Sequence, residues 1–148
     1  MFDKKTQRGF TLLEILIVIG IIGILAGIVI IAINPAKQLA DSRNSQRSTD
    51  VNAIINATHQ YAVDNNGALP ATITNIPTDI CATGSTNCAG MIDLAVLTEN
   101  ERYITSIPKD PISSTATNVG YQISKNINNR ITVTASHAEL EKVISVTR

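Results

Sequence analysis

The chain has 148 residues, and its 12 lysines and arginines balance its 12 aspartates and glutamates, so the formal net charge at pH 7 is zero. A neutral chain lacks the excess positive charge with which proteins bind the phosphate backbone of nucleic acids. An aromatic content of 3% without tryptophan leaves few rings on which single-stranded bases stack. Many of the hydrophobic residues lie in residues 10–33, so the composition predicts an apolar N-terminal segment followed by a small polar domain.

Residues 15–33 carry no polar side chain. A helix over residues 10–34 would be about 36 Å long, enough to cross a hydrocarbon core of roughly 30 Å. The run is longer than the ~7–15 residues typical of a cleaved secretory signal, which leaves an ordinary membrane anchor as the main alternative. Basic residues flank the run equally on both sides and so do not orient it: Lys4, Lys5 and Arg8 precede it, and Lys37, Arg43 and Arg47 follow it.

Glu14 lies within this apolar segment. A carboxylate in the middle of a bilayer costs roughly 2.5–3.5 kcal/mol on insertion scales, so we expect Glu14 to have a positive partner. Cleavage between Gly9 and Phe10 would create an α-amine on Phe10, one helical turn away, at the positive end of the helix dipole. In an array of packed chains, Glu14 could also meet the Phe10 amine of a neighbouring copy and set the register between copies.

Residues 7–14, Gln-Arg-Gly-Phe-Thr-Leu-Leu-Glu, followed by the long run of isoleucine, valine and leucine, resemble the processing and assembly motif of type IV pilins and type II secretion pseudopilins. The resemblance implies that residues 1–9 are a leader that a prepilin peptidase removes after Gly9. It implies that Phe10 is then N-methylated and that Glu14 guides the docking of subunits. It also implies a membrane-spanning and filament-core helix over residues 10–34.

Two features predict a weak point in the helix. Gly23 and Gly27 form a GxxxG pattern, which lets helices approach closely in lipid, although glycine is also generally common in membrane helices. Pro35 cannot donate a hydrogen bond to the carbonyl of Ile31 and therefore favours a kink or a break. In filaments of the family part of this segment is often unwound, so we expect the weak point between Gly23 and Pro35.

Residues 35–66 are predicted to form the amphipathic half of one long α-helix that ends near Gly67. Its total length would be near 84 Å. The apolar face follows helical spacing and consists of Leu39, Val51, Ile54, Ile55, Thr58, Tyr61 and Ala62. Residues 41–50 form a polar patch that would either be solvated or face neighbouring helices in a filament. His59 and His137 have no metal-ligating neighbours in the sequence, so we interpret them as surface or packing residues and predict no metal or cofactor.

Residues 67–148 are predicted to form a globular head. Cys81 and Cys88, beyond a membrane anchor, predict a small loop-closing disulfide in an oxidising compartment. Residues 91–100 are expected to form a short helix. Residues 103–111, Tyr-Ile-Thr-Ser-Ile-Pro-Lys-Asp-Pro, resemble the link before the sheet in major pseudopilins. Asp110 resembles an aspartate that neighbours a calcium loop in secretion pseudopilins, but we interpret it as a turn former.

The last third of the chain alternates between apolar and polar residues, which predicts three antiparallel strands. Their apolar faces contain Val119, Tyr121 and Ile123, then Ile131, Val133 and Ala135, then Ile144 and Val146. Residues 126–129 form the turn between the first two strands, and residues 138–141 link the second and third. Such a sheet needs a cover on its apolar face, and the helical stripe at residues 51–61 is available. The predicted fold class is therefore α+β, a long N-terminal helix packed against a small antiparallel sheet.

We interpret the chain as a structural subunit of a type IV pilus or pilus-like filament, polymerised through its N-terminal helix, and not as an enzyme. The alternatives are a pseudopilin of a type II secretion or DNA-uptake system and, in another class, a single-pass membrane-anchored binding protein. The resemblance implies these partners: other copies and other pilins, prepilin peptidase, membrane lipid before assembly, and indirectly an assembly platform protein and ATPase. Nucleic acid would be a partner only of a DNA-uptake pilin. The expected location is the inner membrane, leader in the cytoplasm and head outside, and then an extracellular or periplasmic filament.

Overall fold

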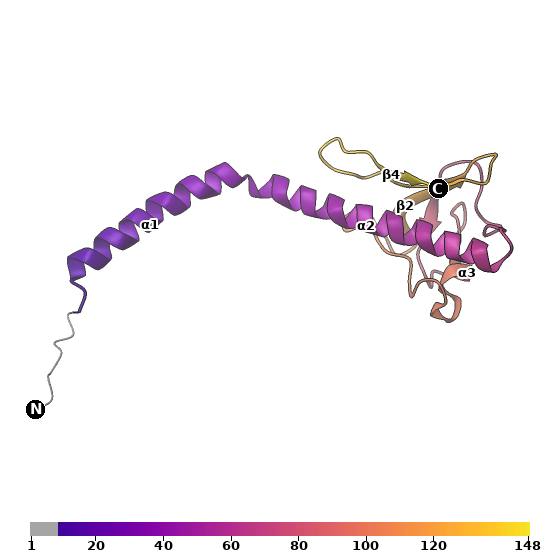
Figure 1. The fold of residues 1–148 in the computed structure, drawn as a ribbon, viewed down its shortest axis with the longest axis horizontal. Coiled ribbons are helices and arrows are strands. Elements are labelled where there is room, and N and C mark those ends of the chain that lie inside the picture. Colours follow the sequence, from indigo (N-terminus) through magenta and orange to yellow (C-terminus); the bar gives the residue numbers. More distant parts are fainter. Residues whose placement is uncertain (1–8) are drawn as a thin grey trace, which may run out of the picture. The chain divides into compact units, whose positions relative to one another are not determined.

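A computed structural model of the chain describes residues 9–148 (Figure 1). The predicted leader, apart from Gly9, lies outside the described residues. The chain divides into an N-terminal unit that ends at Gln38 and a second unit from Leu39 to Arg148. Each unit is described by itself.

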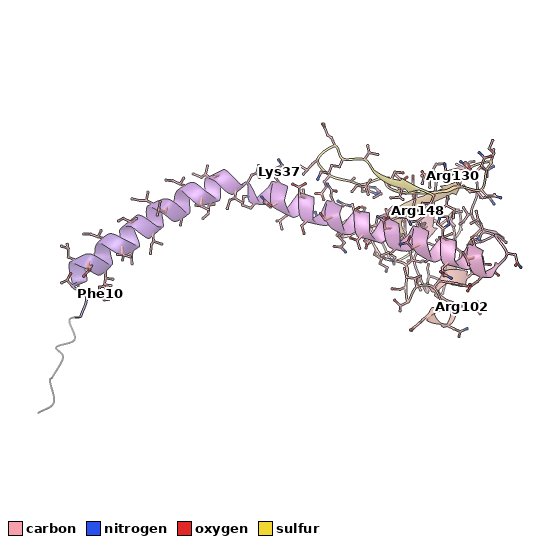
Figure 2. All side chains as sticks on the ribbon, in the orientation of Figure 1. Phe10, Lys37, Arg102, Arg130 and Arg148 are labelled. Carbon is pink, nitrogen blue, oxygen red and sulfur yellow. A yellow bond between two sulfur atoms is a disulfide. The ribbon has the colours of Figure 1, made fainter. Side chains whose placement is uncertain are left out.

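The N-terminal unit contains helix α1, Leu12–Ile33. Thr11 caps it, because its side-chain oxygen accepts a hydrogen bond from the backbone N–H of Glu14 at 3.2 Å. None of its residues is buried, and side chains project from all around the helix (Figure 2). A helix that is apolar on every side requires an apolar environment, and α1 is long and apolar enough to cross a membrane.

Helix α1 ends at Ile33, and the single residue Asn34 separates it from helix α2, Pro35–Asp64. Asn34 takes a left-handed conformation, φ 47° and ψ 79°, and its side-chain oxygen accepts a hydrogen bond from Lys37 N at 3.3 Å. The chain therefore has two helices with a break at the proline that was expected to favour one, and not a continuous helix from residue 10 to about 65. Proline disfavours helical backbone at the residue before it and is itself well suited to a first helical position. Gly23 and Gly27 lie inside regular helix, so the interruption is at the proline end of the expected weak segment.

Helix α2 carries the buried face on which the head is built. Its buried residues are Ala40, Asn44, Arg47, Val51, Ile54, Ile55, Ala57 and Thr58. The helix ends where Gly67, with φ 85°, donates its N–H to the carbonyl of Ala62 at 2.7 Å. A left-handed glycine just after the last turn is a common way to satisfy the final carbonyls of a helix.

The second unit contains one antiparallel sheet of four strands in the order β1-β2-β3-β4. The strands are β1 (Thr78–Cys81), β2 (Asn118–Lys125), β3 (Ile131–Ala135) and β4 (Ile144–Thr147). The three predicted strands are confirmed as β2, β3 and β4. The prediction of a three-stranded sheet was wrong, because β1 pairs with β2 as a fourth strand. Strand β1 is short, and its register with β2 shifts between Asp79 and Cys81, so it has no clear alternation to signal it.

One face of the sheet packs on α2, as the sequence predicts. The core combines Val51, Ile54 and Ile55 of α2 with the inward residues of β2 and β3, which are Val119, Tyr121, Ile123, Ile131, Val133 and Ala135. The opposite face is polar, and hydroxyl pairs join its strands, such as Thr132–Thr147 at 2.9 Å. The helix expected at residues 91–100 is shorter than predicted: α3 covers Ala95–Thr98 and is followed by the 3₁₀ helix η1, Glu99–Glu101.

Candidate functional site

The residues with predicted processing and assembly roles lie at the start of α1. Gly9 and Phe10 are exposed and precede the helix, and Figure 2 shows Phe10 just before its first turn. Glu14 is also exposed and belongs to the first turn of α1. An accessible, non-helical Gly9–Phe10 bond suits a protease, and a carboxylate in the first turn suits a positive partner. Cleavage, methylation and docking at these residues stay predictions.

Arg47 forms a buried ion pair that the sequence analysis did not anticipate. Its Nε lies 2.6 Å from Asp110 Oδ2, and its Nη2 lies 3.3 Å from Asp110 Oδ1. The side chains of Arg47 and Asp110 are 1% and 0% exposed. Nη1 of Arg47 also donates to Glu139 Oε2 at 2.8 Å and to Asn44 Oδ1 at 3.1 Å. One guanidinium on α2 thus holds two segments that are far apart in the sequence.

Asp110 is further fixed by its own loop. Its Oδ1 accepts hydrogen bonds from Ile112 N at 2.9 Å, Ser113 N at 2.7 Å and Ser113 Oγ at 2.7 Å. Gly120 of β2 packs against it, and a Cβ on this glycine would lie 2.7 Å from Asp110 Cβ, so only glycine fits there. Burial alone would raise the pKa of Asp110, but Arg47 and the donors of Ser113 outweigh it and hold the pKa well below its usual range.

Residues 136–143, which connect β3 to β4 and are called the strap here, are fastened to α2 by Glu139. The Glu139 carboxylate accepts from Arg43 at 2.7 and 2.6 Å and from Arg47 at 2.8 Å. Its backbone exchanges two hydrogen bonds with the Asn44 side chain, at 2.8 and 3.0 Å. A further ion pair joins Lys142 Nζ to Asp41 Oδ1 at 2.7 Å. The hydrogen bonds from Arg43 and then Arg47 lower the pKa of Glu139 to about 2.

Next to this cluster, the hydroxyl of Tyr121 donates to Asp50 Oδ2 at 2.7 Å. Burial, followed by the neighbouring Asp50, raises the pKa of Tyr121 far above its usual value. Burial also raises the pKa of Asp50, against the effect of the tyrosine hydrogen bond. The buried hydroxyl of Tyr121 therefore has a hydrogen-bond partner on α2, as a buried hydroxyl requires.

The interpretation of residues 41–50 as a solvated patch or a face toward other helices was wrong for Asn44 and Arg47. Both are buried because Asp110 and the strap cover this side of α2. The spacing contained a signal that we did not use. Ala40, Asn44, Arg47 and Val51 recur at intervals of four, three and four residues, which extends the buried stripe of Val51 and Ile54 toward the start of α2.

The remaining predicted residues are placed as follows. Cys81 and Cys88 form a disulfide, with their Cα atoms 5.5 Å apart. His137 contacts Ser136 in the strap, and His59 lies on α2 with its Nε2 buried. Within residues 9–148, no group of three or more His, Cys, Asp or Glu side chains is positioned to hold a metal ion.

An open cleft of about 400 Å³ lies where the C-terminal end of α2 meets residues 96–103. Asp64 accepts hydrogen bonds there from Arg102 at 3.0 Å and from the Tyr103 hydroxyl at 3.1 Å. Tyr103 also packs edge-on against Tyr61, with ring centroids 5.6 Å apart. These side chains satisfy one another's hydrogen bonds, so we interpret them as a structural cluster at the surface. The described residues that line the cleft include no activated nucleophile.

The cluster around Arg47 predicts a loss of stability in acid. Asp110 and Glu139 have folded-state pKa values below those of unfolded chains, about 3.9 for Asp and 4.3 for Glu. Their stabilisation is therefore complete above about pH 5 and is lost as the pH falls from about 4 to 2 and below. Asp50, with its raised pKa, offsets part of this loss. We expect the urea midpoint of the full chain in detergent to fall over this range.

Two matched variants identify the origin of that fall. Glu139→Gln should flatten the pH dependence, because one of the carboxylates with a lowered pKa is gone. Glu141→Gln should leave the pH dependence unchanged, since Glu141 takes part in none of the ion pairs found among residues 9–148. Equal pH profiles of stability for the wild type and Glu139→Gln would show that Glu139 does not contribute to the loss of stability in acid.

Comparison with known proteins defines the class. Residues 4–30 match the family model for the prokaryotic N-terminal methylation motif. That motif, the apolar α1 and the α+β head together place the chain in the family of type IV pilins and type II secretion pseudopilins.

Within the family, the chain is similar to type II secretion system core protein G from several bacteria. It is 36% identical to that of Escherichia coli over 105 residues, which are 71% of this chain and 66% of the relative. It is 42% identical to that of Aeromonas hydrophila over 64 residues, 43% of each chain. For Vibrio cholerae the identity is 40% over 65 residues, 44% of this chain and 43% of the relative. The chain thus spans from under half to about two thirds of the length of these relatives. No solved structure matches it significantly.

Proposed function

We propose that this chain is a pseudopilin of the type II secretion kind, a structural subunit that polymerises into a pilus-like filament. The observation that carries the proposal is helix α1, which is apolar and exposed along its whole length and is preceded by the methylation motif. The similarity to core protein G favours this function over the type IV pilus subunit that we placed first from the sequence alone.

In the proposed cycle, α1 anchors the precursor in the membrane with its leader in the cytoplasm and its head outside. Prepilin peptidase removes the leader after Gly9, and the new amine on Phe10 is methylated. Copies then leave the lipid and pack through α1, in a filament that also contains other pilins. The move exchanges lipid contacts for equally apolar helix contacts, so its free-energy cost stays small. An assembly platform protein and an ATPase would supply the work indirectly.

The processing step is tested by mass spectrometry of the membrane-bound chain. We expect the mature protein to begin at Phe10 and to carry one additional methyl group on its amine. In cells that lack prepilin peptidase, the same chain should keep its first nine residues, because a new N-terminus at Phe10 requires the cut after Gly9. A mature chain that begins at Met1 or Phe2 in both strains would contradict the proposal and favour a single-pass anchored binding protein.

Deletion of the gene for this chain distinguishes a secretion pseudopilin from a pilus subunit and from a DNA-uptake pseudopilin. A pseudopilin of a secretion system predicts that exported enzymes accumulate inside the mutant cell while surface pili remain visible by electron microscopy. Loss of surface pili with normal export would instead favour the pilus subunit. Loss of DNA uptake alone would favour the uptake pseudopilin, whose filament would have nucleic acid as a partner.

A further inference from the structure

The strap at residues 136–143 is held firmly, yet it buries little apolar surface of its own. Its Glu139 and Lys142 make the ion pairs to α2 described above. Its two large aliphatic side chains point outward, and Leu140 is 45% and Val143 is 89% exposed. The head core formed by α2 and the sheet contains neither of them. The fastening of the strap therefore serves a purpose other than filling the core.

The backbone of the strap supports the same conclusion. Leu140 and Glu141 are consecutive residues with positive φ, 58° and 56°. Left-handed backbone is unfavourable for residues with a Cβ, and more so for a bulky side chain such as leucine. Such conformations persist where the surroundings impose them, and they cluster at functional sites. Here the contacts of Glu139 and Lys142 impose a conformation that displays Leu140 and Val143.

We propose that the strap is a contact surface for a neighbouring copy of this chain, centred on Leu140 and Val143. The inference deepens the proposed function and rests on it. The identity of the partner, a second copy of the chain, follows from where the strap is fastened. The strap is bonded to four residues in the first turns of α2, which are Asp41, Arg43, Asn44 and Arg47. Asp41 lies only six residues, or about 9 Å along the helix, after the start of α2.

Copies that pack through α1 start their α2 helices side by side, because a single residue separates the two helices. The strap is thus fastened to the part of the head that directly follows α1 in the sequence. Leu39 adds a third exposed aliphatic side chain there, one turn before Arg43 on the same face of α2.

Three exposed aliphatic side chains offer little apolar area compared with the ~800 Å² that each partner buries in a stable interface. Helix α1 must therefore supply most of the contact between copies. The strap adds a specific contact that fixes how neighbouring heads sit against each other. A charge placed in this contact would have to be desolvated without a partner, which is unfavourable, so it should lower assembly without affecting the isolated subunit.

The test compares Val143→Asp with Ile127→Asp in the full chain. Ile127 is a matched control because it is an equally exposed aliphatic residue, 92% against 89%, in the turn between β2 and β3. We expect Val143→Asp to lower the yield of sedimentable filaments about tenfold, equivalent to roughly 1.4 kcal/mol per contact. Ile127→Asp should assemble like the wild type. Both variants should keep the wild-type melting temperature in detergent.

A photo-activated cross-linking residue at position 143 gives an independent measurement. We expect cross-links between copies of the chain in assembled filaments, and their loss when Glu14 is replaced and assembly fails. Normal filaments from Val143→Asp, an equal loss with Ile127→Asp, or cross-links from position 143 only to other proteins would each overturn the inference while leaving the filament intact. If the wild type itself forms no filament, the proposed function fails, and the inference fails with it.

Discussion

Replacing Glu14 with glutamine is expected to reduce filament yield by at least about tenfold, while the processed subunit stays in the membrane. A single unmatched interaction of roughly 1.4 kcal/mol already changes an equilibrium tenfold. Glu14 lies in the first turn of α1, where an acid meets both the positive helix terminus and, after cleavage, the amine of Phe10. Glutamine keeps the size of the side chain but has no charge with which to select the correct stagger between copies.

The control for this variant is Thr11→Ala. Thr11 caps α1 through its hydrogen bond to Glu14 N, and losing such a cap costs about 0.5–2 kcal/mol of helix stability but leaves the carboxylate in place. We expect Thr11→Ala to assemble far better than Glu14→Gln, as judged by sedimentation and electron microscopy. Mass spectrometry establishes that both variants begin at Phe10. Normal filament yield and spacing from Glu14→Gln would overturn the proposed role of the acid.

Replacing Arg47 with methionine is expected to lower the free energy of unfolding of the head by about 3–5 kcal/mol, the usual effect of removing one partner of a buried ion pair. The change leaves Asp110 fully buried with only the donors of its own loop. It also releases one of the two arginines that fasten Glu139. Urea denaturation of the full chain in detergent, followed by circular dichroism, measures the loss.

Two further variants establish the cause. Arg102→Met removes an arginine that is also paired with an aspartate, Asp64, but is 66% exposed, so we expect a loss of no more than about 1 kcal/mol. Arg47→Met combined with Asp110→Asn removes the buried charge together with its partner, and should recover part of the stability lost in the single variant. A loss below about 1 kcal/mol for Arg47→Met would contradict the central place of this ion pair.

The elements that could be predicted from the sequence are those with a strong local pattern. Helix α1 follows from an unbroken apolar run, and β2, β3 and β4 follow from alternation of apolar and polar residues. Strand β1 could not be predicted, because Thr78–Cys81 is short and its pairing with β2 is irregular. The break at Asn34 agrees with the kink or break expected at Pro35, although the expected length treated the residues on both sides as one helix.

The cluster around Arg47 shows why polar parts of a fold are harder to predict. Its members come from α2, from the loop that begins at Asp110 and from the strap, with sequence separations of 63 and 92 residues from Arg47. No local pattern relates them. An arginine among serines and asparagines has the composition of a solvated face, and only the tertiary contacts make it a buried one.

The disulfide between Cys81 and Cys88 has a consequence for when the head matures. It joins the end of β1 to the loop that follows, and such bonds form and persist where thiols are oxidised rather than in the reducing cytosol. If the head crosses the membrane as proposed, this bond is made only after translocation, in the oxidising compartment outside. The supply of disulfide-bonded subunits would then depend on the oxidant available to the cell. Limitation of oxygen or quinone would slow filament growth by slowing the formation of this disulfide.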